Sequence, residues 1–120
     1  MNDELYYMND ELEQAFRQGY IAGRSEADKR LKKIAVHYGY TAQREQFEEE
    51  CAEAILAAQK CKRTSNNLLE YEKNLLNLAE EVADVLIMAR QMRLLIDSKL
   101  VDSIIEEKLN RQLERISKGE

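Results

Sequence analysis

Apolar residues recur every three or four positions along most of the chain, and short polar or glycine-containing breaks separate these stretches. That spacing is the period of an α-helix with one buried face. Runs in which apolar and polar residues alternate, as in a strand, are not found, and the sequence contains no proline. We therefore predict an all-α protein, a four-helix-type bundle with an extra N-terminal helix.

The breaks predict where each helix begins and ends. The first helix covers about residues 1–18 and ends at a turn between Gly19 and Gly23. The later helices are expected at about 25–39, 42–62 and 68–96, with Ser25, Thr41 and Asn67 as N-caps. Asp97 and Ser98 mark a break, and a last helix then runs to about Ser117. We assign residues 1–24 to an N-terminal helical appendage and residues 25–120 to one helical domain.

The two C-terminal helices carry the strongest apolar patterns. Residues 75–89 are apolar nearly all round the helix, which predicts the centre of a bundle. The last helix has a single apolar stripe that we predict to face inward, formed by Leu100, Ile104, Ile105, Leu109, Leu113 and Ile116.

Two pairs of carboxylates interrupt these apolar stretches. Glu50 and Glu53 lie one turn apart on one helix, and Glu81 and Asp84 lie one turn apart on the next. If the two helices pack antiparallel, the four carboxylates converge, and such a group is costly without a cation. Oxygen ligands of this kind suit Mg²⁺, with Mn²⁺ as a substitute. The alternative is that they are solvated pairs on exposed helix faces.

Charge and composition narrow the class of protein. The net charge of −5 argues against binding a nucleic acid polymer, which usually needs a basic face. No apolar run reaches the ~20 residues needed to span a membrane, and the N-terminus lacks the order of a signal peptide. We expect a cytoplasmic protein whose two cysteines, Cys51 and Cys61, are free thiols.

The acidic pairs resemble a known motif. Glu49-Glu50-Cys51-Ala52-Glu53 followed by Glu81-Val82-Ala83-Asp84 is similar to the EExxE…ExxD signature of the MazG-like, all-α nucleoside triphosphate pyrophosphohydrolases. Residues 37–43 and 107–115 resemble flanking segments of that family, so the likeness covers about residues 30–116. Ala54 stands where the family commonly has leucine, and residues 1–24 have no counterpart that we can place.

The resemblance implies an activity and a set of roles. The family hydrolyses a nucleoside or deoxynucleoside triphosphate to the monophosphate and pyrophosphate, as dimers or tetramers with sites between subunits. By position, the metal ligands would be Glu50, Glu53, Glu81 and Asp84, and Glu49 would be the catalytic carboxylate near the attacking water. Lys108 and Arg111 would hold phosphate, and Gln43 and Tyr38 would contact the base.

Two other functions fit the same pattern of helices. A non-catalytic helical interaction protein would keep the bundle, and possibly the metal, without turnover. A plain helical dimerisation module would have neither metal nor activity. The sequence leaves these alternatives open, together with the base, the sugar and the size of the oligomer.

Overall fold

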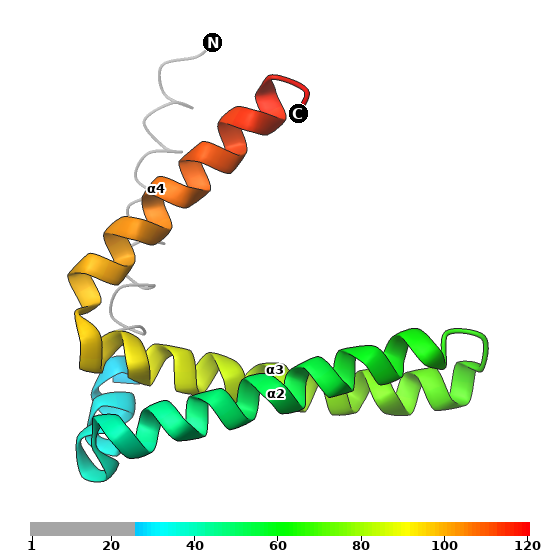
Figure 1. Ribbon diagram of the computed structural model, residues 1–120, viewed down its shortest axis with the longest axis horizontal. Helices are drawn as coiled ribbons and strands as arrows, with labels where there is room; N and C mark the ends of the chain where they lie inside the picture. Colours follow the sequence, from blue (N-terminus) through cyan, green and yellow to red (C-terminus); the bar gives the residue numbers. More distant parts are fainter. Residues whose placement is uncertain (1–25) are drawn as a thin grey trace, which may run out of the picture.

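The chain is all-helical over residues 26–120, the part that the computed structural model describes (Figure 1). Residues 26–38 form a helix, and α2 (Tyr40–Arg63), α3 (Leu68–Ile96) and α4 (Ser98–Ser117) follow. No strand occurs in this range, which confirms the all-α prediction. The helix predicted at 1–18, the turn at Gly19 to Gly23 and the Ser25 cap lie outside the described residues.

Gly39 alone separates the helix at 26–38 from α2. Its φ of 85° and ψ of 165° suit glycine, because a side chain strains the backbone at such a φ. Its N–H donates to the Ala35 carbonyl at 2.9 Å, and its carbonyl accepts from the N–H of Gln43 at 3.0 Å. The prediction of a Thr41 cap was therefore wrong, since Gly39 occupies the N-cap position and α2 begins at Tyr40.

A four-residue connection at 64–67 folds α2 and α3 into an antiparallel hairpin. The Thr64 hydroxyl donates to the Lys60 carbonyl at 2.8 Å and accepts from the Asn74 amide at 3.0 Å, which joins the ends of both helices. The Asn67 side chain accepts from the N–H of Glu70 at 3.2 Å. The predicted Asn67 cap is confirmed, and α3 has the predicted bounds.

The core formed by residues 26–120 is small. Its buried apolar residues come from the helix at 26–38, from α2 and from α3: Leu31, Ala35, Ala57, Cys61, Met88 and Met92. The radius of gyration is 19.3 Å, whereas a compact 120-residue domain is expected near 14 Å. Along α3, where we predicted the centre of a bundle, Leu75, Leu76, Val82, Leu86 and Ile87 are exposed. The other described helices therefore leave much of the apolar surface of α3 uncovered.

A sharp elbow at Asp97 separates α3 from α4. The N–H of Asp97 donates to the Arg93 carbonyl at 3.1 Å and ends α3, and its carboxylate accepts from the N–H of Leu100 at 3.1 Å and caps α4. Asp97, in an extended conformation, is thus both the C-cap of α3 and the N-cap of α4. As a result α4 points away from the hairpin (Figure 1).

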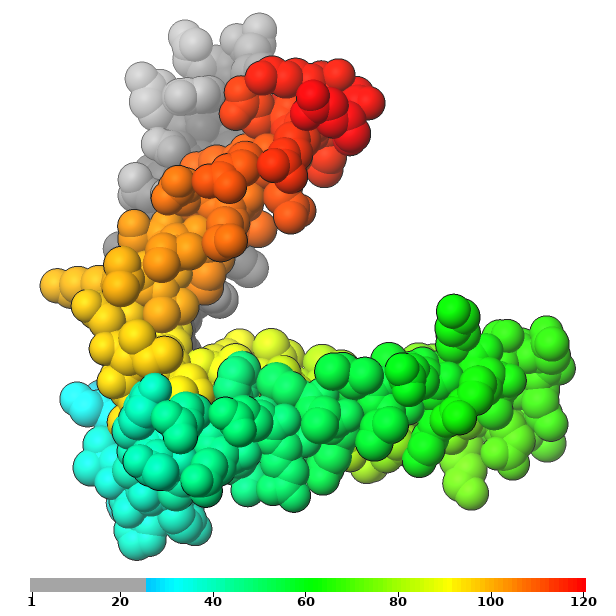
Figure 2. All heavy atoms as spheres, in the orientation of Figure 1, coloured from blue at the N-terminus to red at the C-terminus, as the bar shows by residue number. Residues whose placement is uncertain are grey.

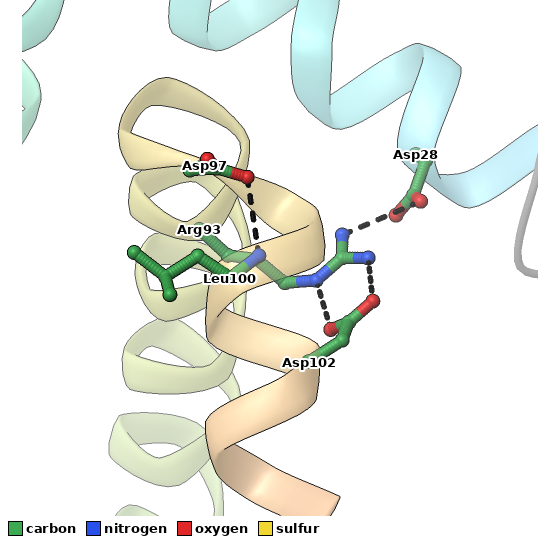
Figure 3. Close-up of polar contacts among 5 residues, drawn as sticks. All are labelled: Asp28, Arg93, Asp97, Leu100 and Asp102. Atoms are coloured by element: carbon green, nitrogen blue, oxygen red, sulfur yellow. Dashed lines mark hydrogen bonds and ion pairs between the residues drawn. The ribbon is translucent and has the colours of Figure 1, made fainter.

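Arg93 links α3 to α4 at this elbow (Figure 3). Its Nε and Nη2 each donate to Asp102 of α4 at 2.6 Å, a bidentate ion pair, and its Nη1 approaches Asp28 at 3.5 Å. The side chain of Arg93 is only 13% exposed. The hydrogen bonds to Asp102 raise the pKa of Arg93 further above its ordinary value, so the guanidinium stays charged. One cation therefore joins α3, α4 and the helix at 26–38.

The apolar stripe of α4 does not face a core within the chain. The side chains that we predicted to point inward are 41% to 69% exposed, and the second half of the helix stands clear of the hairpin in the space-filling view (Figure 2). The prediction that this stripe faces inward is therefore wrong within residues 26–120, because no element in that range covers it. Among the described helices, none combines the length and the apolar character needed to cross a bilayer.

Candidate metal centre

Three of the predicted carboxylates meet at the middle of the hairpin. Glu50 and Glu53 project from successive turns of α2, and Glu81 projects from α3. One carboxylate oxygen from each lies within 4.8 Å of the others. The antiparallel hairpin thus produces the convergence that the i, i+3 spacing predicted, for three residues of the four.

These carboxylates repel one another. The charge of Glu50 is the main cause of a raised pKa at Glu53, followed by desolvation and by the charges of Glu81 and Glu49. One oxygen of Glu50 has a hydrogen-bond donor, because its Oε1 accepts from the Gln46 amide at 2.8 Å. The Oε2 atoms of Glu50 and Glu81 are buried and lack a hydrogen-bond partner among the described residues. Buried unpaired acceptors are rare and call for a donor or a cation.

Asp84 and Glu49 lie outside this group of three carboxylates. Asp84 is exposed and does not belong to the set of mutually close carboxylates. Its side chain is one methylene shorter than that of glutamate, so its carboxylate stays nearer to α3. Glu49 is exposed on α2 but close enough for its charge to raise the pKa of Glu53.

The donor set fits a hard divalent cation. Carboxylate oxygens on two rigid helices are ligands for Mg²⁺ or Mn²⁺, and a cation would satisfy the buried oxygens of Glu50 and Glu81. Exposed acidic groups are common without an ion. The two buried, unpaired oxygens distinguish this group from an ordinary exposed cluster. An ion held here with open positions can polarise a phosphoryl oxygen or activate a water.

The residues assigned to phosphate and base lie elsewhere. Lys108 and Arg111 are exposed on α4, and Arg111 contacts Glu107 at 3.3 Å. Tyr38 is exposed at the end of the helix at 26–38 and packs edge-to-face on His37. Gln43 is only 5% exposed near the start of α2, and its Oε1 is buried without a partner among the described residues. The structure of one chain therefore does not test their predicted roles, because the resemblance implies sites between subunits.

Sequence reasoning missed two polar residues, the buried Gln91 and the partly buried Arg93. Gln91 of α3 is 2% exposed, and its buried Oε1 has no hydrogen-bond partner in the described part of the chain. Arg93 is the centre of the elbow described above. A signal was present for both, because Gln91 and Arg93 lie close together in a mainly apolar stretch just before a helix break. The contacts of Gln91 and Arg93 depend on the angles between helices, and the spacing of apolar residues in the sequence does not reveal those angles.

Comparison with known proteins adds no relative: no family model, curated protein or solved structure matches the chain.

Proposed function

We propose that the chain is a magnesium-dependent nucleotide pyrophosphohydrolase that converts nucleoside or deoxynucleoside triphosphates to monophosphates and pyrophosphate. The observation that carries the proposal is the meeting of Glu50, Glu53 and Glu81, in which Glu50 and Glu81 each have one buried oxygen without a hydrogen-bond partner among the described residues. The likeness of the surrounding sequence to the MazG-like signature supports the choice of reaction.

Each residue has a part in this reaction. A bound Mg²⁺ or Mn²⁺ would supply Lewis acidity toward a phosphoryl oxygen. Glu50, Glu53 and Glu81 would hold the ion, with Asp84 at its edge. The neighbouring Glu49 orients the attacking water and takes its proton as the water oxygen forms a bond to the α-phosphorus. The bond from the α-phosphorus to the bridging oxygen breaks at the same time, so pyrophosphate leaves with that oxygen and the monophosphate remains.

The remaining assigned residues would bind the substrate. Lys108 and Arg111 neutralise phosphate oxygens, and Arg111 offers two donors in one plane. The Gln43 amide and the Tyr38 ring contact the base by hydrogen bonding and stacking. Because these groups are spread over α2, α4 and the helix at 26–38, we propose that the active form is a dimer or tetramer of the chain.

The first test is pyrophosphate release from a panel of ribo- and deoxynucleoside triphosphates, with magnesium and with chelator. Release that depends on magnesium and yields the monophosphate supports the proposal. Glu50→Gln and Glu81→Gln should reduce the rate to background while the helical content by circular dichroism is unchanged. Glu48→Gln is the matched control, because Glu48 is exposed, pairs only weakly with Arg44 at 3.9 Å, and lies outside the carboxylate group. A Glu50→Gln protein with normal turnover would overturn the assignment.

A non-catalytic interaction protein is the second candidate, and the exposed apolar faces of α3 and α4 favour it. It predicts no pyrophosphate release from any triphosphate. If magnesium still raises the melting temperature, the carboxylates form a structural metal site. If magnesium has no effect, the chain is a plain dimerisation module.

A further inference from the structure

We infer that residues 1–18 form a helix that packs antiparallel along an apolar face of α4 in the same chain. These residues lie outside the described part of the chain, and we call them the N-terminal segment. Neither the carboxylate group nor turnover enters this contact, so it stands apart from the proposed function.

One face of α4 is apolar and is not covered by any residue of the range 26–120. Ile105, Leu109, Leu113 and Ile116 share this face, because they follow one another at spacings of four, four and three. Their exposed fractions lie between 48% and 69%. None of the residues of α4 is buried by the described part of the chain. A continuous apolar face of this kind marks a site of contact.

The N-terminal segment has an apolar face that matches the face of α4 in length. Leu5, Met8, Leu12, Ala15 and Phe16 recur at helical spacing and lie on one side of the predicted helix. A helix over residues 1–18 is ~27 Å long, and α4, with 20 residues, is ~30 Å long. The segment can therefore cover α4 over nearly its whole length.

The described chain begins beside the first turns of α4, which sets the direction of the contact. Asp28 lies 3.5 Å from Arg93, and Arg93 pairs with Asp102 of α4 (Figure 3). Residues 19–25 can span at most ~25 Å. A parallel arrangement would put residue 18 about 22 Å further along α4, so this connection would be almost fully stretched. Its two glycines instead predict a turn, which leaves residue 18 near the start of α4 and the two helices antiparallel.

The edges of the two apolar faces carry opposite charges. Lys108 and Arg115 are seven positions apart, and each directly precedes a residue of the apolar face of α4. Glu4 and Glu11 are also seven positions apart, and each directly precedes a leucine of the N-terminal segment. Seven positions are two helical turns, so each pair borders one edge of its face. When two helices pack antiparallel, these two edges lie on the same side, where ion pairs between helices form.

Both charge pairs fit a single register. The residue numbers of opposite positions in an antiparallel pair have a constant sum, and this sum is 119 for Glu4 with Arg115 and also for Glu11 with Lys108. The same register places residue 18 opposite Val101, at the start of α4 beside the elbow. Exposed ion pairs contribute little energy, so they select the direction and register while the buried apolar faces supply the stability. So weak a pair does not hold Lys108 against the phosphate contact proposed above.

Carbodiimide cross-linking of the full-length protein tests the pairing, because this reagent joins a carboxylate to a lysine amine in direct contact. Unlabelled and ¹⁵N-labelled chains are mixed, cross-linked and digested for mass spectrometry. Glu11 should link to Lys108, with both peptides from chains of the same label. Glu13, on the other side of the predicted helix, is the internal control and should not link. Arg115→Lys should add a link from position 115 to Glu4.

Several cross-linking results would overturn the inference. A link that joins an unlabelled and a labelled chain would place the N-terminal segment on a second copy. A link from Lys108 to Glu13 would exclude the register, and the absence of any link between residues 1–18 and α4 would exclude the contact. No step uses turnover, so a chain without pyrophosphohydrolase activity tests the contact equally well.

Amide hydrogen exchange measures the apolar part of the contact. In Leu12→Glu, exchange over residues 105–116 should be faster by about tenfold or more, because α4 loses its cover. Leu109→Glu removes the contact from the other side and should speed exchange over residues 1–18. Leu76→Glu is the matched control, since Leu76 is 65% exposed on α3, and it should change neither region. Exchange in α4 that is the same in Leu12→Glu as in the wild type would overturn the inference.

Discussion

Replacing Arg93 with methionine should destabilise the chain more than any comparable change of a surface arginine. Methionine keeps the aliphatic part of the side chain next to α4 but removes all of the hydrogen bonds to Asp102 and the contact with Asp28. Two carboxylates then remain near each other at the elbow without their shared cation. The effect should be a loss of global stability together with a less fixed angle between α3 and α4.

The size of the effect follows from the exposure of the partners. A fully buried pair that loses one member costs ~3–5 kcal/mol, but the side chains of Asp102 and Asp28 are 38% and 29% exposed and can be hydrated in the variant. The two hydrogen bonds at 2.6 Å are therefore taken near ~1 kcal/mol each. The expected loss is ~2 kcal/mol, which for a domain of this size lowers the melting temperature by roughly 6–8 °C.

Thermal unfolding followed by circular dichroism, at one fixed protein concentration, measures this loss. Arg90→Met is the control, because Arg90 is exposed on the same helix and has no ion pair with a described residue. Asp102→Asn should have a smaller effect than Arg93→Met, since the amide still accepts one hydrogen bond. A shift for Arg93→Met no larger than that for Arg90→Met would refute the assignment of the elbow to this cluster.

Two further predictions concern the carboxylate Glu53 and the glycine Gly39. Because the pKa of Glu53 is raised, the folded chain binds the proton of this carboxyl more tightly than the unfolded chain does. The protonated carboxyl therefore contributes to stability at low pH, and that contribution is lost as the pH rises above the ordinary pKa of glutamate. With chelator present, Glu53→Gln should raise the melting temperature at pH 7, and this gain should shrink as the pH falls toward ~4; a gain that grows on acidification contradicts the repulsion. Gly39→Ala should cost ~1–3 kcal/mol in urea unfolding, because a Cβ there meets no atom within 4 Å and only the positive φ opposes it. An unchanged urea midpoint would contradict the assignment of backbone strain to this position. Ala42→Gly, on the exposed first turn of α2, is the control for a change of one methyl group.

The bounds of α3 and α4 could be predicted because their caps are local. Asn67 and Asp97 each bond an N–H three residues ahead, and that preference is a property of the residue type and its position. Thr41 has the same preference, but the positive φ of Gly39 lets α2 begin at Tyr40, one residue before Thr41, so the prediction there was wrong. Local chemistry therefore predicts helix ends well when a single candidate is present.

The site and the packing between helices could be predicted only in part, for a physical reason. Spacing placed Glu50, Glu53 and Glu81 on facing sides of two helices, because one short connection leaves the hairpin little choice. The same spacing could not reveal that Leu109 and Leu113 would be exposed, since a period identifies a face but not what covers it. The pairing of Arg93 with Asp102 depends on the angle at the elbow, which no pattern within one helix encodes.

The elbow also bears on the order in which the chain assembles. Arg93 and Asp102 are nine positions apart, and the capping bonds of Asp97 span four positions or fewer. Contacts this close in sequence form early, because little chain entropy is lost in closing them. The angle between α3 and α4 is thus set within a single chain during folding. If chains associate, they would then do so with α4 already pointing away from α2 and α3 (Figure 1). The rate of association should depend on protein concentration, whereas the rate of helix formation should not.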